Sequence, residues 1–238
     1  MGHHGRGGLF FGGTIISAEP ALTPHITPNQ IEQVFNFYAG KDFPKKLQQQ
    51  MIFIAEVDKL KNIFRRTLLT DGCRRENDAE HSWHLALMAI VLEEYAPEPV
   101  NLGRVLAMVT VHDLIEIYAG DTFAFDVSAN QDKAQREQAA AEKLFGMLDE
   151  QQGSELRQLW EEFDAMDTAD SRFAASLDRI QPFMHNVLTE GHTWKLGSVT
   201  KEQVYRRMEP VKTGTPALWP WLESQVAAAI EKGWIKEQ

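Results

Sequence analysis

Residues 101–120 read NLGRVLAMVTVHDLIEIYAG, an apolar run with an adjacent histidine and aspartate near its end. The run begins with a favourable N-cap residue, Asn101, and ends with glycine, which predicts one helix between them. Burying His112 and Asp113 among aliphatic side chains is costly unless both have partners. A divalent metal ion is one such partner. The alternative is that His112 and Asp113 form hydrogen bonds with neighbouring groups in the core and have no functional role. Glu116 follows at helical spacing and lies on the same face.

The rest of the chain also follows helical periods. Helices are predicted over residues 27–40, 42–60, 78–95, 128–148, 154–166 and 168–190, and two more begin at Thr200 and Thr215. The polar, glycine-containing stretch over residues 67–79, TLLTDGCRRENDA, is predicted to be a loop. Because no strand alternation longer than a few residues occurs, we expect an all-α fold in which residues 25–238 form a single domain. Residues 1–24 are expected to be disordered or to form a loose arm.

Composition limits the classes of partner. The 238 residues carry a formal net charge of −10, which argues against binding of polymeric nucleic acid. No apolar run approaches the roughly 20 residues that a membrane-spanning helix needs, so no membrane association is expected. Cys73 is the single cysteine, which excludes an intrachain disulfide and a cysteine-rich zinc site. A cytoplasmic location is the natural prediction.

Basic residues are concentrated between residues 59 and 75, against the acidic background of the chain. They are Lys59, Lys61, Arg65, Arg66, Arg74 and Arg75. One interpretation is a solvated helix end followed by a loop. The other is a local anion site, in which Arg65 or Arg66, and less directly Arg74 or Arg75, hold a phosphate through charge-assisted hydrogen bonds.

Two further side chains could complete a metal site. His81 follows the first turn of a predicted helix and supplies a second imidazole, although such a histidine is often only a hydrogen-bonded packing residue. His84 lies three residues later, and packing or support of a ligand is the preferred role for it. Asp178 borders the apolar stripe of its helix beside small residues, which suits a ligand. A salt bridge to Arg172 or Arg179 is the alternative role for this aspartate.

Taken together, His81, the pair His112-Asp113 and Asp178 resemble the H…HD…D signature of the HD-domain phosphohydrolase superfamily. The runs EHSWHLALMA and HDLIEIYAGDT are most similar to the branch that contains the 5′-deoxynucleotidases and the HD-domain-containing protein 2 group. The likeness covers roughly residues 45–195. It implies an all-α HD-domain helical bundle with one divalent metal ion, commonly a homodimer. The implied activity is hydrolysis of a phosphomonoester, from a (deoxy)nucleoside 5′-monophosphate.

The resemblance also implies roles for individual residues. The implied metal ligands are His81, His112, Asp113 and Asp178. Glu116 matches the residue credited with general acid work, and Asp121 matches the one placed near water and the sugar. Arg65 or Arg66 can stand for the arginine that contacts substrate in the nucleotidases, but the tryptophan that accompanies it there has no counterpart here. Two imidazoles and two carboxylates suit Mn, Co, Fe, Ni, Zn or Mg.

Other functions stay open at this point. Another hydrolase of the same fold would act on polyphosphates, nucleoside triphosphates or phosphodiesters. A non-catalytic module would bind a nucleotide or a partner protein, although the complete ligand set together with Glu116 and Asp121 speaks against it. Trp219, Trp221 and Trp234 could form a partner-binding helix at the C-terminus, but such a stripe more often packs on its own domain.

Overall fold

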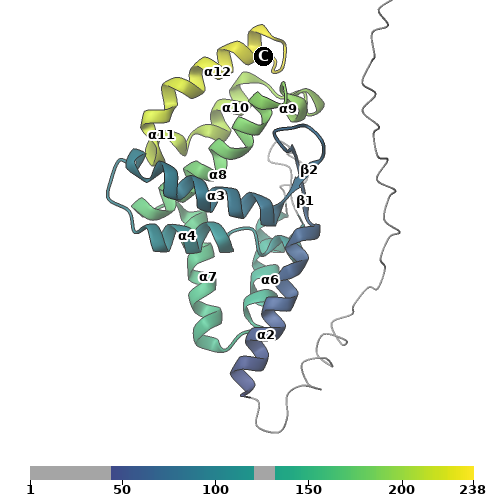
Figure 1. Cartoon of the computed structure of the whole chain (residues 1–238), viewed down its shortest axis with the longest axis vertical. Coiled ribbons are helices and arrows are strands. Elements are labelled where there is room, and N and C mark those ends of the chain that lie inside the picture. The colour runs from purple at the N-terminus through teal and green to yellow at the C-terminus, as the bar shows by residue number, and fades with distance from the viewer. Residues whose placement is uncertain (1–43, 121–131) are drawn as a thin grey trace, which may run out of the picture.

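The computed structural model describes residues 44–120 and 132–238, and these residues are mostly helical (Figure 1). The α-helices are α2 (Lys45–Val57), α3 (Asp78–Leu92), α4 (Leu102–Val111), α5 (Glu116–Ala119), α6 (Lys133–Phe145), α7 (Glu150–Ala165), α8 (Ala169–Leu188), α9 (His192–Leu196), α10 (Lys201–Met208), α11 (Val211–Gly214) and α12 (Trp219–Glu231). Short 3₁₀ helices are η1 (Asp58–Asn62), η2 (Glu93–Tyr95) and η3 (Pro216–Leu218). Two short strands, β1 (Phe64–Leu68) and β2 (Arg75–Asn77), form an antiparallel pair.

The all-α fold class predicted from the sequence is confirmed. The predicted arm over residues 1–24 and the predicted helix over residues 27–40 lie outside the described residues. The expectation that residues 25–238 form a single domain stays a prediction.

Helix α8 is the central element, and α3, α4, α7 and α11 pack against it (Figure 1). Thr168 caps its N-terminus by accepting a hydrogen bond from the backbone of Ser171 at 3.1 Å. The small residues of α8 allow a close approach, as the sequence suggested. A Cβ atom at Gly214 in α11 would overlap the backbone of Arg172 and the side chain of Ser176. Glycine is therefore needed where α11 crosses α8.

Two clusters of buried hydrophobic side chains form the core. The first joins α3, α4, α8, α10 and α12, and includes Leu85, Val105, Met108, Leu177, Val204 and Val226. The second joins α2, η1, α6 and α7 with the segment after α4, and includes Phe53, Leu60, Leu114, Ile115, Leu144 and Trp160. Val109 belongs to the first cluster and Val111 to the second. Residues 112 and 113 therefore lie at the junction of the two clusters.

The single helix predicted over residues 101–120 is wrong in its middle. Helix α4 ends at Val111, a turn occupies residues 112–115, and α5 begins at Glu116. Within this turn the backbone N–H of Leu114 bonds to the carbonyl of Val111 at 3.0 Å, a spacing of three residues instead of four. The tighter turn lets Leu114 and Ile115 enter the second cluster while α4 stays in the first. A continuous helical period does not reveal this change of direction.

The loop predicted over residues 67–79 is also wrong in part, because it contains β2 and the end of β1. The strands pair with an irregular register. Gly72, in the turn between them, has a φ of +71°, a conformation that favours glycine. Arg75 braces the pair by donating to the backbone carbonyls of Phe64 and Arg65. Strands this short give no sequence alternation, which explains the error.

The C-terminal tryptophans pack on the chain itself. The Trp219 ring lies 5.8 Å from that of Tyr205, and both side chains pack against the first cluster. Trp221 lies edge-on to Phe183 with 5.6 Å between ring centroids. Trp234 also packs against the first cluster and covers Gly191. These contacts agree with packing on the chain's own domain, although Trp221 is still 37% exposed, so the partner-binding alternative stays a prediction.

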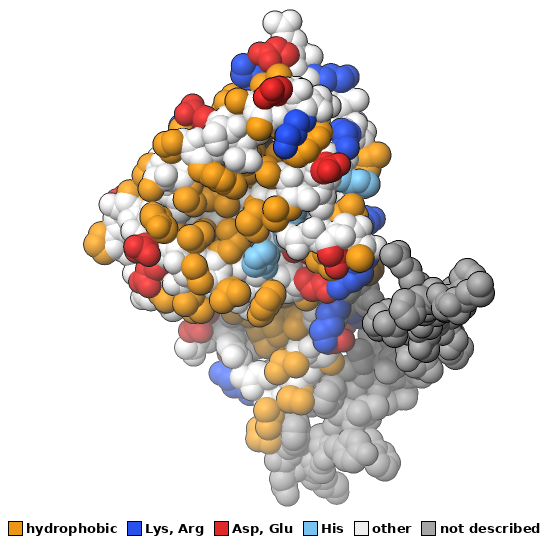
Figure 2. All heavy atoms as spheres, turned by 45° about the horizontal axis from the view of Figure 1, so that its top comes forward, with side chains coloured by type: hydrophobic (Ala, Val, Ile, Leu, Met, Phe, Trp, Pro, Cys, Tyr) orange, Lys and Arg blue, Asp and Glu red, His pale blue; other side chains and the backbone are white. Residues whose placement is uncertain are grey.

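Hydrophobic side chains gather over a large part of the face shown in Figure 2. Large exposed hydrophobic residues on α3 are Trp83, Leu87, Ile90 and Val91. Exposed apolar patches of this kind are typical of surfaces that contact another molecule. In residues 44–120 and 132–238, no helix is both long enough and apolar enough to cross a membrane.

Candidate metal centre and substrate cavity

Four side chains that lie far apart in the sequence meet between α3, α4 and α8. Nε2 of His81 lies 2.9 Å from Oδ1 of Asp178, and Nε2 of His112 lies 3.8 Å from the same oxygen. Oδ2 of Asp113 is 3.2 Å from Nε2 of His112 and 3.9 Å from Nε2 of His81. All four residues are buried. The structure thus brings together the four residues that the sequence selected as metal ligands.

Local structure explains how the two imidazoles come to point inward. Asn77 caps α3 and forms a reciprocal capping box with Glu80, which fixes His81 at the end of the first helical turn. His112 lies directly after the last residue of α4, and its Nδ1 bonds to the carbonyl oxygen of Val109 at 3.0 Å. Because Nδ1 donates this hydrogen bond, Nε2 of His112 is the nitrogen that faces the carboxylates.

Gln181 orients the other imidazole, a role that the sequence analysis missed. Its side-chain N–H donates to Glu76 at 2.6 Å, so its carbonyl oxygen is directed to Nδ1 of His81 at 3.0 Å. Nδ1 of His81 therefore carries the proton, and Nε2 offers a lone pair toward Asp178. Hydrogen bonds of this kind commonly fix the tautomer of metal-binding histidines. The sequence did contain one indication of this role, because Gln181 follows Asp178 by three residues and so lies on the same face of α8.

The donor set fits a divalent cation. Nε2 of His112 is buried and has no hydrogen-bond partner, although Asp113 is close to it. An unpartnered buried nitrogen needs an explanation, and a metal ion is a suitable partner for it. The facing atoms of His81, His112 and Asp178 all lie within 4.8 Å of one another. Two nitrogen and two carboxylate donors are suited to a first-row transition metal or magnesium.

Electrostatics keep both carboxylates ready to bind a cation. Burial opposes the ionisation of Asp113, but His112 and Arg65 outweigh it and hold the pKa of this carboxyl low. Burial is likewise outweighed at Asp178, where Arg179 contributes most to a lowered pKa. Both side chains are therefore ionised near neutral pH.

The two imidazoles have opposite pKa shifts. Burial, with Arg65 nearby, lowers the pKa of His81 to about 4. Burial also acts to lower the pKa of His112, but Asp113 and Asp178 outweigh it and raise the pKa to about 10. Without a bound cation, these shifts favour the neutral form of His81 and the protonated form of His112 near neutral pH.

Metal binding at this centre is therefore expected to release protons. A metal ion needs the lone pair of His112 Nε2, so ligation near pH 7 should displace roughly one proton per cation. His81 is already neutral and should release none. Calorimetric titration with a divalent metal in buffers of different ionisation enthalpy measures the number released. A binding heat that does not depend on the buffer would contradict the raised pKa of His112.

Arg65 on β1 lies close to several buried carboxylates. Its guanidinium lies 2.7 Å from Oδ2 of Asp113 and 3.3 Å from Oδ1 of Asp78. A second guanidinium nitrogen is 4.0 Å from Asp178. Arg65 therefore offsets part of the negative charge of three buried aspartates.

A cavity of about 230 Å³ opens beside the four converging residues. Its cationic lining residues are Arg65, Arg66, Lys133, Arg179 and Arg207. Its aromatic lining residues are Trp160, Phe163, Phe183 and Trp194. Arg179 donates a hydrogen bond to Asp178, and Arg207 lies 3.7 Å from the same carboxylate. A cavity that contains both cations and aromatic rings suits a ligand with an anionic group and a flat ring.

The remaining candidate residues fall into three groups. Glu116 lines the cavity, and one of its carboxylate oxygens lies within 4.8 Å of carboxylate oxygens of Asp78 and Asp113. Asp121 lies outside the described residues. Neither Arg74 nor Arg75 is among the described residues that line the cavity: Arg74 pairs with Glu80, and Arg75 holds the backbone of β1. The structure thus does not bring these two arginines to the site.

The geometry of Asp178 is compatible with both roles considered for it. The sequence left a metal ligand and a salt bridge to Arg172 or Arg179 as alternatives. Oδ2 of Asp178 accepts from Arg179, while Oδ1 faces the imidazoles of His81 and His112. Arg172 is directed elsewhere and pairs with Glu98 at 2.7 Å. Arg179 and Arg207 are cavity residues that the sequence analysis did not identify as binding residues.

Comparison with known proteins gives one family match and several relatives. A family model described as HD domain matches residues 57–219. Proteins named 5′-deoxynucleotidase HDDC2 from Homo sapiens and Bos taurus are 28% and 29% identical to the chain over 130 residues. Each match covers 54% of this chain and 62% of the relative. The chain therefore spans less than two thirds of the length of these relatives.

A solved structure is similar over a larger share of the chain. The protein from Magnetospirillum magnetotacticum MS-1, described as a predicted metal-dependent phosphohydrolase, is 49% identical in sequence, with a TM-score of 0.76. The similarity covers 80% of this chain and 95% of that protein. The described fold is thus shared with a protein assigned to metal-dependent phosphate chemistry.

Proposed function

The chain belongs to the HD domain family, and from this premise we propose that it is a divalent-metal-dependent hydrolase of phosphomonoesters, with a (deoxy)nucleoside 5′-monophosphate as the substrate class. The observation that carries the proposal is the convergence of two imidazoles and two carboxylates beside a cavity lined by cations and aromatic rings. The relatives named 5′-deoxynucleotidase support the nucleotide part of the proposal.

The residues proposed to hold the cation are His81, His112, Asp113 and Asp178. Each imidazole presents Nε2 to the centre because its Nδ1 is bonded elsewhere, which supports this assignment. A bound divalent cation would lower the pKa of a coordinated water and polarise the phosphate. The protein contributes the orientation of these ligands and the surrounding cavity.

The phosphate is proposed to bind to the arginine side chains that line the cavity. Arg65 is held there by Asp78 and Asp113, and the neighbouring Arg66 lines the same cavity. Arg179 and Arg207 approach from α8 and α10 on the far side of Asp178. Guanidinium groups bind phosphate oxygens through charge-assisted hydrogen bonds, which suits this role. The aromatic side chains of the cavity would pack against the base of the nucleotide.

Glu116 is proposed to donate a proton to the oxygen of the leaving group. It begins α5 beside Asp113, and it lines the same cavity as the cations. Such general acid assistance is worth about 10²–10⁴-fold in rate. The role of Asp121 near water or a sugar hydroxyl stays a prediction from the resemblance.

Replacing Arg207 with alanine is expected to raise KM for a nucleoside monophosphate by roughly 10- to 100-fold, because one charge-assisted hydrogen bond is worth about 1.5–3 kcal/mol. Bound metal should stay unchanged. The matched control is Arg206→Ala, since Arg206 is exposed and pairs with Glu202 outside the cavity. Steady-state kinetics and metal analysis of both variants provide the measurement. Equal KM values for the two variants would show that Arg207 on α10 does not bind the phosphate.

A substrate screen tests the proposed function directly. Ribo- and deoxyribonucleoside 5′-monophosphates are compared with polyphosphate, nucleoside triphosphates and a phosphodiester, each with Mn, Co, Fe, Ni, Zn or Mg. Phosphate release from the monophosphates supports the proposal. Faster turnover of one of the other classes would favour another hydrolase of the same family. Nucleotide binding without turnover under any metal would favour a non-catalytic module.

Two further expectations follow from the sequence. The resemblance implies a homodimer, and the exposed apolar residues of α3 offer a surface for it. The cytoplasmic location rests on the single cysteine and stays a prediction. Neither expectation is needed for the proposed chemistry.

A further inference from the structure

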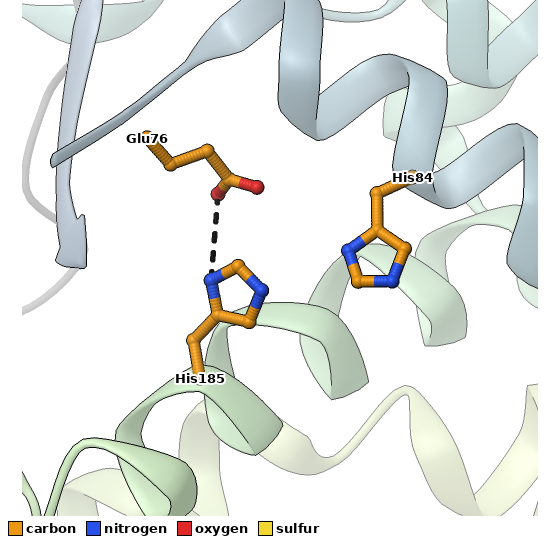
Figure 3. Close-up of side chains that lie close together, drawn as sticks. All are labelled: Glu76, His84 and His185. Atoms are coloured by element: carbon orange, nitrogen blue, oxygen red, sulfur yellow. Dashed lines mark ion pairs between the residues drawn. The ribbon is translucent and has the colours of Figure 1, made fainter. Parts of the chain in front are cut away.

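A second group of possible metal ligands lies behind the first centre. Glu76 on β2, His84 on α3 and His185 on α8 point toward one another (Figure 3). One ligand atom from each residue lies within 4.8 Å of the others. The group shares no residue with His81, His112, Asp113 and Asp178.

Buried atoms in this group lack the hydrogen bonds that such atoms normally make. Glu76 is 1% exposed and His185 is 2% exposed. Oε2 of Glu76 and Nδ1 of His185 make no well-formed hydrogen bond and are separated by 3.8 Å, although the backbone of Leu68 interacts with the His185 ring. Leaving buried polar atoms unpaired costs on the order of 1–3 kcal/mol each. The metal-free arrangement is therefore poorly satisfied.

Gln181 cannot satisfy the whole group. Its side-chain nitrogen lies 2.6 Å from Oε1 of Glu76, 3.2 Å from Nδ1 of His84 and 3.2 Å from Nε2 of His185. An amide nitrogen has two protons, so it can serve at most two of these three neighbours well. Its carbonyl oxygen is already bonded to His81. A cation is a better partner for two imidazoles and a carboxylate than this single amide.

We propose that Glu76, His84 and His185 form a second metal site that binds a borderline divalent cation, with Zn²⁺ as the expected ion. Two histidines and one carboxylate are a common ligand set for zinc, which keeps a fourth position for water when three protein side chains bind it. His84 is half-buried, whereas Glu76 and His185 are buried. The site connects β2, α3 and α8.

The second site is connected to the first centre through the side chain of Gln181. Gln181 bonds to His81 through its carbonyl oxygen and faces the second group through its nitrogen. A cation held by Glu76 and the two histidines would compete with this nitrogen for its acceptors. Its binding would reorient the amide that fixes His81.

Counting the bound zinc tests the proposal independently of any hydrolysis. The metal-stripped full chain is titrated with Zn²⁺ alone by calorimetry, and bound zinc is then measured by elemental analysis. We expect two equivalents for the unchanged protein. His84→Ala should lose one equivalent and keep the other, and Glu76→Gln, which preserves the side-chain shape, should do the same. His192→Ala serves as the control and should keep both.

A variant of the first centre distinguishes zinc bound there from zinc bound at the second site. His112→Ala should lose one equivalent and retain the one bound by Glu76, His84 and His185. Combining His112→Ala with His84→Ala should leave none. One equivalent in the unchanged protein with none in His112→Ala would overturn the second site. Two equivalents without phosphate release in the substrate screen would leave the second site standing and reject the proposed hydrolase.

Discussion

Replacing His112 with alanine is expected to remove one bound cation and to reduce phosphate release by at least about 1,000-fold, because the metal supplies both the activated water and the polarised phosphate. The residue presents one of the two imidazoles at the proposed centre, and its buried Nε2 makes no hydrogen bond. Elemental analysis and steady-state kinetics measure the two effects.

Controls for this variant must separate loss of ligation from loss of structure. His112 packs against Phe163 with 4.7 Å between ring centroids, so its removal also leaves a small cavity in the core. Circular dichroism should show that the helical content is retained. His192→Ala removes a histidine at the N-terminus of α9 and should retain full activity. A His112→Ala protein with wild-type metal content and turnover would refute the assigned centre.

Replacing Glu116 with glutamine is expected to lower kcat by about 10²–10⁴-fold and to leave the metal content unchanged, since the residue is assigned to proton transfer and not to ligation. Glutamine keeps the shape of the side chain but cannot donate a proton as a carboxylic acid does. Comparison of kcat across a range of pH, together with metal analysis, checks both parts of the expectation.

Glu137 on α6 is the matched comparison for Glu116. It also lines the cavity, and burial, as the largest influence, raises its pKa above the usual range of a glutamate. A carboxyl group with a raised pKa is suited to donate protons. If Glu137→Gln loses turnover while Glu116→Gln keeps it, the general acid is Glu137. We expect the opposite, because Glu116 lies beside Asp113 of the metal centre.

Several parts of the site could be predicted because they depend on spacing along one helix. Asp178 and Gln181 lie three residues apart on α8, and His81 follows the capped first turn of α3. Polar residues at such positions of a buried helix stand out against the apolar pattern. Their partners across the fold could not be predicted in the same way. The direction of the Gln181 amide is set by Glu76 on β2, in a strand too short to be recognised.

Other features depend on how distant elements pack. Arg207 reaches the cavity because α10 lies beside α8. Nothing in the neighbouring sequence distinguishes it from Arg206. The turn at residues 112–115 arises because successive apolar residues belong to two different clusters. His84 was interpreted as packing or support. Its position beside Glu76 and His185 depends on the hairpin, which the sequence analysis missed.

The pairing of Arg65 with the buried aspartates has a consequence for the order of events during turnover. The oxygen of Asp113 that holds this guanidinium at 2.7 Å belongs to a carboxylate assigned to the cation. Two positive groups compete for one carboxylate oxygen, so a cation bound by Asp113 would weaken the contact of this carboxylate with Arg65. Arg65 would still be held by Asp78, with part of its guanidinium available to an incoming anion. Under the proposed function, we therefore expect the phosphate ester to bind more tightly once the cation is in place.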